Sequence, residues 1–245
     1  STRSKKQLAD TLTPVGIFLR LREQYKYSVM LESADYHAMQ NSFSYIGCDP
    51  VASIVIDDDE VKQVFPDGSH ENFKLKKRKD AVAVLKNFAS RFVAPENKNG
   101  FISNGLFGHM AYDAVQYFED IEIQGKNEDN KIPSIIYRVY RYVIAINHFK
   151  NELNIFEHTY GGEANPVENG LETIELFVNS PKSSTRKFKV TSEEESNVTD
   201  EQMAATVNIC IKHCHRGDVF QVVPSRRYSK HFDGDDFNVY RALRS

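Results

Sequence analysis

Apolar and polar positions in the first half of the chain follow the pattern of β-strands joined by turns. Residues 25–31 and 52–56 are rich in β-branched and aromatic side chains, which predicts two strands. Three consecutive aspartates separate residues 52–56 from a similar run at 61–65, and a Pro-Asp-Gly turn then leads toward residues 72–75. This succession predicts an antiparallel meander.

A longer strand signal lies at residues 135–147, where β-branched and aromatic side chains dominate. A polar segment separates it from the apolar residues 153–156, so the two runs predict a β-hairpin with a longer loop. A further short strand is predicted at residues 188–190, beyond a linker of Ser, Thr and Lys at residues 180–187.

Three segments carry helical periodicity instead. Between residues 80 and 92 the apolar side chains fall on one face of a helix, which we expect to cover one side of the sheet. Asn165 and Pro166 can supply the N-cap and first-turn proline of a second helix. Its buried stripe is then Leu171, Ile174 and Val178.

The third helix has the clearest sequence signals of the chain. Thr199 and Gln202 fit a capping box, and Gly217 follows the last turn as a helix-ending glycine. Its apolar residues, which we expect to form a buried stripe, are Met203, Val207, Ile211 and Cys214. The apolar run 219–223 after the glycine predicts a strand suited to the interior of a sheet, ended by Pro224.

These elements predict an α+β fold, in which a mainly antiparallel β-sheet or sandwich is packed by a few helices. The linker at residues 180–187 predicts a boundary between a domain of residues 1–185 and a second region of residues 186–245. With 245 residues, of which 40% are hydrophobic, the chain can bury a substantial core.

Charge and composition narrow the classes of function. The net charge of −3 leaves no basic excess for nucleic-acid binding, and we interpret the basic run 74–79 as a solvated strand end leading into a helix. No apolar stretch approaches the roughly 20 residues that cross a bilayer. Three cysteines and no apolar leader sequence predict a reducing, cytoplasmic location.

One helical cluster has the spacing of metal ligands. Cys210, His213 and Cys214 share one side of the third helix and could bind zinc. The alternative is structural, because only three ligands converge and Cys214 continues the apolar stripe, while histidines in a last turn complement the helix dipole. We favour the structural interpretation and predict no metal ligands in this chain.

Three stretches in the same order resemble one enzyme family. Residues 217–229 read Gly-Asp-Val-Phe-Gln-Val-Val-Pro-Ser-Arg-Arg-Tyr-Ser, which is similar to the signature opening the chorismate-converting half of anthranilate synthase component I. Leu-Glu-Ser at residues 31–33, with Ser-Tyr-Ile-Gly-Cys-Asp-Pro at 44–50, resembles the amino-terminal pattern of that family. The segment 105–119 resembles its Gly-Tyr-Ile-Gly-Tyr-Asp stretch.

The resemblance implies an activity for the parent protein. The family converts chorismate and ammonia to anthranilate and pyruvate in tryptophan biosynthesis, with ammonia supplied from glutamine by a separate amidotransferase subunit. The chemistry requires Mg²⁺ to hold the substrate carboxylates. The family's magnesium ligands and catalytic acid and base lie in segments that this chain lacks. We therefore expect no catalytic residues, no bound cofactor and no activity from the fragment alone.

The resemblance also implies a feedback site for L-tryptophan. In the family, the Leu-Glu-Ser segment contributes to it, so Leu31, Glu32 and Ser33 are the candidate contacts, with Ile46 near the indole. By composition alone, Glu32 and Ser33 would be an ordinary exposed turn. In residues 105–119 we expect an architectural role, with Asp113 capping the next helix.

Two departures from the family pattern affect these expectations. Residues 41–44 read Asn-Ser-Phe-Ser where the family has Gly-Arg-Tyr-Ser, and Pro224 replaces an apolar residue. Two other functions stay open: a fragment of aminodeoxychorismate synthase component I, and a non-catalytic amino-acid-binding module. An unpartnered strand at residues 219–223 would also favour self-association of the fragment.

Overall fold

The computed structural model describes residues 1–33, 42–93, 101–123, 132–181 and 187–244. It divides into two compact units, Ser1–Ser184 and Thr185–Ser245, which we call the first and second units. The predicted boundary between residues 185 and 186 lies outside the described residues.

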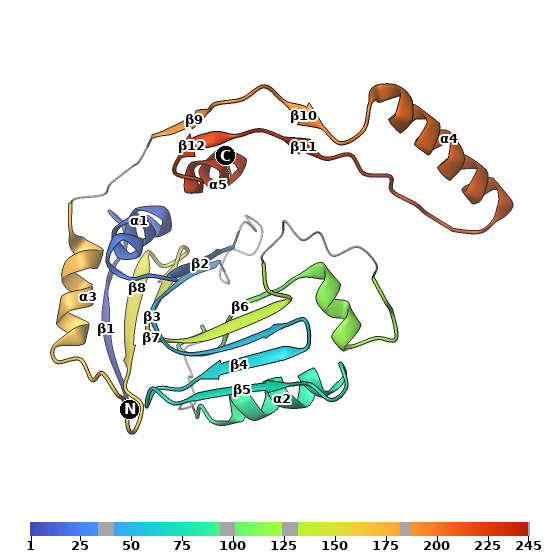
Figure 1. Cartoon of the computed structure of the whole chain (residues 1–245). Helices are drawn as coiled ribbons and strands as arrows, with labels where there is room; N and C mark the ends of the chain where they lie inside the picture. The colour runs from blue at the N-terminus through green and yellow to red at the C-terminus, as the bar shows by residue number, and fades with distance from the viewer. Residues whose placement is uncertain (34–41, 94–100, 124–131, 182–186, 245) are drawn as a thin grey trace. The chain divides into compact units, whose positions relative to one another are not determined.

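The first unit is built on an eight-stranded antiparallel sheet (Figure 1). Six strands follow the order β1-β8-β7-β3-β4-β5, while β2 pairs with β3 and β6 pairs with β7. The strands are β1 (Thr2–Leu8), β2 (Val29–Glu32), β3 (Phe43–Asp57), β4 (Glu60–Val64), β5 (His70–Lys74), β6 (Phe107–Met110), β7 (Ile135–Asn147) and β8 (Glu152–His158). This antiparallel sheet with its helices confirms the predicted α+β class, the meander and the β7–β8 hairpin.

Strands β3 and β7 form the centre of the sheet, and each changes its outer neighbour partway along. β3 pairs first with β2 and later with β4, whereas β7 pairs first with β6 and later with β8. Between Pro50 and Ala52 the β3–β7 register shifts, and nearby Asp49 adopts a positive φ of 58°. Bulges of this kind bend a strand and increase its twist, which curls the sheet.

Among its described residues, the first unit has three α-helices and a 3-10 helix: α1 (Pro14–Gln24), α2 (Asp80–Ser90), η2 (Tyr112–Tyr117) and α3 (Gly170–Asn179). Figure 1 shows α1 and α3 at the β1 end of the sheet and α2 at the β5 end. Helix α1 begins with a cap in which the Thr13 hydroxyl accepts a bond from the Gly16 amide at 3.0 Å.

The predicted strand at residues 25–31 is wrong in its first half. The helix α1 continues to Gln24, and the amide of Tyr25 still donates to the Leu21 carbonyl, so the strand begins only at Val29. Helix α3 also begins later than predicted. Its N-cap is Asn169, with a left-handed backbone, rather than Asn165.

The start of α3 is set by its approach to the sheet. A Cβ atom on Gly170 would lie 2.2 Å from both Glu157 Oε1 and the Tyr142 hydroxyl, so glycine allows the helix to begin against β7 and β8. The predicted stripe of Leu171, Ile174 and Val178 is buried, as expected.

Buried side chains of the first unit form three clusters. One lies between the sheet and α1 with α3, and it includes Ile17, Leu21, Ile46, Ile144, Leu153 and Ile174. A second lies under α2 and η2, and it includes Ile54, Ile56, Val61, Phe88, Tyr117 and Ile135. The third contains Phe107, Tyr140, Val143, Ala145 and Phe156. The predicted face of α2 is confirmed by the burial of Ala81 and Phe88.

Residues 187–244 of the second unit contain two short ladders and two helices. Strand β9 (Phe188–Val190) pairs with β12 (Phe232–Gly234), and β10 (Glu195–Ser196) pairs with β11 (Tyr228–Ser229). The helices are α4 (Asp200–Arg216) and α5 (Phe237–Arg244). The predicted capping box of α4 is present, and Gly217 ends the helix with a φ of 78°.

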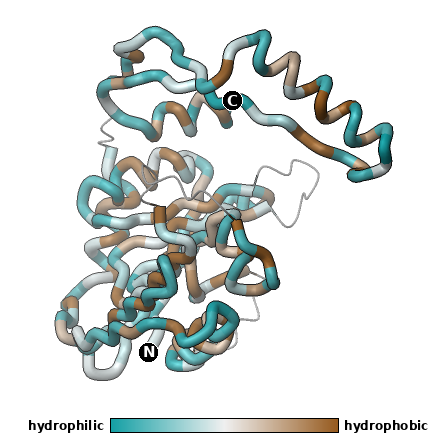
Figure 2. Tube along the Cα trace, turned by 45° about the vertical axis from the view of Figure 1, so that its right-hand side comes forward, coloured by the Kyte–Doolittle hydropathy of each residue, from teal (hydrophilic) through white to brown (hydrophobic). Residues whose placement is uncertain are grey.

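Two expectations for the second unit are wrong. No residue of α4 is buried, although Figure 2 shows hydrophobic residues along this helix, so its apolar stripe forms no core with the described residues of its unit. Residues 219–223 form no strand either. A strand needs a hydrogen-bonded neighbour, and the ladders of this unit include no residue between 219 and 223.

Candidate functional site

The residues predicted to contact a ligand lie at the end of β2. Glu32 is the last residue of the strand and is opposite Ser44 of β3, while Leu31 is opposite Tyr45. Side chains alternate along a strand, so Leu31 and Glu32 point to opposite faces of the sheet. Ser33 follows the strand and is exposed, with its amide donating to the Phe43 carbonyl at 3.2 Å.

The Glu32 face is polar at this edge. Ser44 is fully buried, and its hydroxyl oxygen lies 2.7 Å from Nε2 of His148, a residue in the loop between β7 and β8. Glu32 is half-buried, with its Oε1 atom shielded from solvent. Ile46, on the same face, is buried in the core cluster beneath α1 and α3. A carboxylate, a hydroxyl and an imidazole therefore share one face of the sheet.

The Leu31 face is apolar and aromatic. Leu31 is 43% exposed, and Tyr45 beside it stacks with Phe43 at a centroid distance of 6.2 Å. Phe43 in turn lies 6.1 Å from Phe101, which lies 5.7 Å from Phe156. The structure thus brings Glu32 together with Ser44, and Leu31 together with a row of rings.

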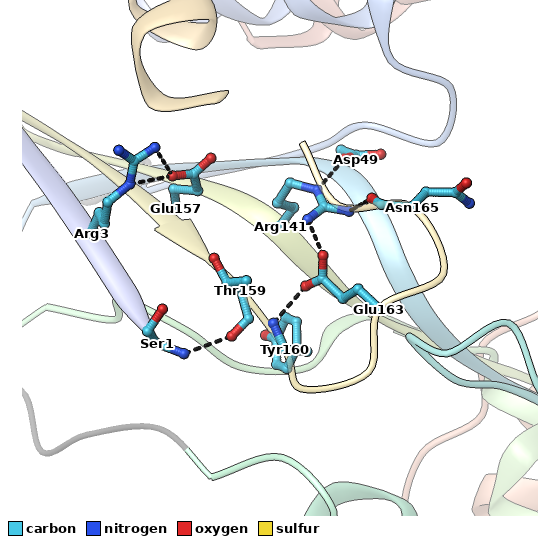
Figure 3. A network of polar contacts seen from close by, with 9 residues as sticks. All are labelled: Ser1, Arg3, Asp49, Arg141, Glu157, Thr159, Tyr160, Glu163 and Asn165. Carbon is cyan, nitrogen blue, oxygen red and sulfur yellow. Dashed lines mark hydrogen bonds and ion pairs between the residues drawn. The ribbon is translucent and has the colours of Figure 1, made fainter. Parts of the chain in front are cut away.

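A buried ionic network joins the centre of the sheet to the loop that follows β8 (Figure 3). Arg141 of β7 donates from Nε to Asp49 at 2.6 Å and from Nη1 to Glu163 at 2.5 Å. Its Nη2 donates to the Asn165 carbonyl at 3.1 Å, and Glu163 also accepts the amide of Tyr160 at 2.5 Å. These contacts tie β7 to β3 and to the loop after β8, so we assign the network a structural role.

The electrostatics of Arg141 agree with that role. Burial alone would lower the pKa of Arg141, but its hydrogen bonds to Glu163 and Asp49 raise the pKa above its ordinary value. A second ion pair, between Arg3 Nη2 and Glu157 Oε2 at 2.6 Å, links β1 to β8 (Figure 3).

In the segment 105–119, the predicted close backbone packing of a glycine is confirmed, but the predicted helix cap is wrong. A Cβ atom on Gly108 would lie 1.8 Å from the Ile136 carbonyl oxygen, so glycine permits β6 to approach β7. Asp113 is not the cap of the next helix. The N-cap of η2 is Ala111, which places Asp113 inside the first turn.

The cysteine and histidine cluster of α4 makes other contacts. His213 Nδ1 lies 2.7 Å from Asp218 Oδ2, and Arg216 donates to the same carboxylate at 3.0 Å. These bonds hold the pKa of Asp218 below its ordinary value. Within the described ranges, no three His, Cys, Asp or Glu side chains converge as metal ligands do.

A family model described as chorismate binding enzyme matches residues 30–245, which is most of the chain and includes every element after β2. This chain belongs to the chorismate-binding enzyme family. The predicted family resemblance is confirmed. In the part of the chain that the structure describes, no helix combines the length and apolar character of a membrane span.

Two relatives illustrate the similarity. The anthranilate synthase component 1 of Aquifex aeolicus is 29% identical over 250 residues, which cover 97% of this chain and 49% of the relative. The probable anthranilate synthase component 1 of Schizosaccharomyces pombe is 26% identical, covering 97% of this chain and 47% of the relative. This family member therefore spans about half the length of the relatives it matches.

A solved structure supports the fold. The chain resembles the crystal structure of anthranilate synthase component I from Streptococcus pneumoniae TIGR4, with a TM-score of 0.57 and 20% sequence identity. The similarity covers 98% of this chain and 52% of the other. At this identity, the comparison shows that the two chains share an α+β fold, and no more.

Proposed function

We propose that this chain is the amino-terminal part of an anthranilate synthase component I. The parent protein would convert chorismate and ammonia to anthranilate and pyruvate, with ammonia supplied from glutamine by an amidotransferase subunit. The observation that carries this proposal is the family match over residues 30–245, combined with relatives named anthranilate synthase component 1. Those names favour anthranilate over aminodeoxychorismate as the product, and tryptophan biosynthesis implies a cytoplasmic setting.

The catalytic centre of the parent would need groups beyond those described here. Magnesium would be held by carboxylates and would bind the carboxylates of chorismate. The described residues do not fit such a site, because no three metal-ligating side chains converge among them. We therefore assign this chain no step that passes through the metal, and we propose that it is inactive alone.

A turnover assay tests the proposed catalytic assignment. The purified chain is mixed with chorismate, Mg²⁺ and an ammonium salt, and anthranilate is followed by its fluorescence. We expect no product from this chain and ready turnover from the full-length parent. Turnover by the isolated chain would refute the view that its catalytic groups lie elsewhere, and aminodeoxychorismate from the parent would move the assignment to the neighbouring enzyme.

For this chain itself, we propose that the end of β2 contributes to the binding of L-tryptophan. The half-buried Glu32 carboxylate would pair with the ligand's ammonium, and the exposed Ser33 hydroxyl would meet its carboxylate. Because Leu31 and Glu32 face opposite sides, a ligand that touches both must lie across the strand end. The aromatic row beside Leu31 offers an apolar surface for the indole.

The chain contains no tryptophan, so the fluorescence of the ligand itself reports binding. We expect L-tryptophan to bind more tightly than D-tryptophan, and Glu32→Gln to weaken binding about tenfold or more because a charge-assisted hydrogen bond is lost. Glu60→Gln, which removes an exposed carboxylate from β4, is the matched control. Equal binding by Glu32→Gln and the unmodified chain would exclude Glu32 from the site.

Self-association is a further proposal for the isolated chain. The apolar residues after Gly217 are exposed, with Phe220 and Val223 the most open to solvent. Exposed apolar segments favour association between copies. Sedimentation over a range of concentrations tests this, and a constant monomer mass would contradict it.

A further inference from the structure

A cavity lies in the first unit beside the bulge of β3. Its volume is about 250 Å³. The walls are Pro50, Val51 and Ala52 from β3 and Val64 from β4, while Tyr27 and Arg138 bring an aromatic ring and a positive charge. The residues around the cavity therefore combine apolar surface with one cation.

The cavity follows from the way in which β3 changes its neighbours. β2 leaves β3 at Gly47, which pairs with Val29, and β4 joins at Ser53, which pairs with Val64. Between these positions neither β2 nor β4 pairs with β3. The bulge near Pro50 lies in this interval and bends the strand.

Arg138 is held in place at this cavity. The carbon of its guanidinium lies 4.7 Å from the centroid of the Tyr27 ring. The backbone of Tyr27 is anchored in turn, because its carbonyl accepts a 2.7 Å hydrogen bond from the buried Tyr140 hydroxyl. Arg138 also forms a side-chain hydrogen bond with the Tyr140 hydroxyl. A guanidinium has five N–H donors in a planar fork, so this bond and the ring stack still leave N–H groups for an external acceptor.

Arg138 differs from the other ring-stacked arginines in its ion pairing. Three arginine–aromatic stacks occur among the described residues. Arg91 over Phe65 pairs with Glu71 at 3.0 Å, and Arg226 over Tyr228 pairs with Asp200. No carboxylate in the described ranges forms an ion pair with Arg138. An ordered, half-buried cation with no acidic partner among the described residues favours an external anion.

We propose that this cavity binds a small monocarboxylate with an apolar body. The carboxylate would accept two hydrogen bonds from the Arg138 fork, and the apolar body would lie against Val51, Ala52 and Val64. The cavity is smaller than the roughly 300–1,000 Å³ of drug-sized sites, which favours a ligand of one ring or a short aliphatic chain. This site is independent of the proposed tryptophan site.

Benzoate is a suitable probe, and benzamide is its matched neutral control. Both are titrated into the complete chain while amide proton–nitrogen correlation NMR spectra are recorded. We expect benzoate to shift the resonances of Ala52, Ser53 and the Arg138 side chain, with benzamide leaving them in place. Absence of these shifts, or equal shifts with benzamide, would overturn the proposal, and neither outcome depends on a variant that must fold.

Two variants then test whether the Arg138 guanidinium binds the benzoate carboxylate. Arg138→Met should weaken benzoate binding about tenfold or more, because a charge-assisted bidentate contact is lost, and Arg138→Lys should restore part of it. The matched control is Arg91→Met, which removes a stacked arginine that already has a carboxylate partner. Unchanged binding by Arg138→Met, or an equal loss in Arg91→Met, would contradict a site at Arg138.

The experiment also separates this cavity from the proposed tryptophan site. We expect Glu32→Gln to bind benzoate as the unmodified chain does, and saturating L-tryptophan to leave the benzoate shifts unchanged. If L-tryptophan displaced benzoate, the two ligands would share one site and the proposed independence would be wrong. Loss of tryptophan binding with benzoate binding intact would instead contradict only the proposed function.

Discussion

Helix α4 of the second unit and strand β7 of the first unit have equally strong local signals, yet they differ in what surrounds them. Helix α4 has a capping box, a terminal glycine and an apolar stripe, but none of its residues is buried. Strand β7 is buried over most of its length and has neighbours on both edges. Local sequence thus determines an element, whereas burial requires partners that a local pattern does not encode.

The same difference applies to charged groups. Arg141 and Glu163 are 7% and 3% exposed in their side chains, whereas Arg216 and Asp218 of the second unit are 63% and 42% exposed. Removing one partner of a buried ion pair is strongly destabilising, whereas an exposed ion pair contributes little to the free energy of unfolding. The comparison between the units can therefore be tested with matched substitutions.

The largest effect is expected from Arg141→Met. This change leaves the Glu163 carboxylate buried without its cation, which should cost about 3–5 kcal/mol of unfolding free energy. Urea unfolding followed by circular dichroism measures the loss. In the exposed counterpart, Arg216→Met, we expect no measurable change, and equal effects in the two variants would remove the distinction between the units.

A matched pair of isoleucines tests burial itself. Ile144 is fully buried and Ile211 is 47% exposed. Ile144→Ala should cost about 2–5 kcal/mol through lost burial and a residual cavity, and Ile211→Ala should stay within about 0.5 kcal/mol. Hydrogen exchange followed by mass spectrometry resolves peptides of β7 and α4 separately. A large loss of protection in α4 would show that Ile211 is covered in solution.

A matched pair of glycines tests backbone contacts. Gly108→Ala forces β6 away from the Ile136 carbonyl and should cost about 1–3 kcal/mol. Gly217 has a φ of 78° and no heavy atom within 4 Å of an added Cβ, so Gly217→Ala should cost about 1 kcal/mol through backbone strain alone. Thermal unfolding measures both, and faster exchange of β6 amides should accompany only the first change.

The smallest expected effect is a pH dependence confined to the first unit. Burial lowers the pKa of His158, whose Nε2 donates to the Ser103 carbonyl at 2.8 Å while Nδ1 lies 3.0 Å from the Thr2 hydroxyl. As the pH falls below the ordinary histidine value of 6.5, His158 is therefore protonated in the unfolded chain before it is protonated in the folded one. Stability should be full above that pH and decline as the pH falls through the lower, folded pKa.

Unfolding free energies measured from above to below pH 6.5 test this effect. His158→Gln should flatten the decline, and His70→Gln, which changes an exposed histidine of β5, should leave it unaltered. A slope that persists in His158→Gln would assign the proton uptake to other groups.

Strands and hairpins were predictable where the sequence alternates and the turns carry their usual residues. β7 begins and ends at the predicted residues, and the β3–β4 hairpin was found from the aspartates between its strands. The buried stripe of α3 was also predicted correctly. Its start was not, because the close approach of Gly170 to Tyr142 and Glu157 depends on residues remote in sequence.

Two elements of the first unit were missed for different reasons. Helix α1 had a detectable signal, since Thr13 and Pro14 are a typical N-cap and first residue. Strand β1 has a largely exposed, charged sequence, and only pairing with β8 makes it a strand. The part of the candidate site formed by Ser44 and His148 could not be predicted, because the register of β3 and the loop after β7 bring them together.

The pairing of β1 with β8 has a consequence for synthesis on the ribosome. Thr2 emerges 156 residues before His158, the partner of its side chain, so the edge of the sheet cannot close until most of the first unit has been translated. Such remote pairings slow folding. A nascent chain halted before β8 would present β1 without its neighbour, and neighbouring nascent chains could then pair with it.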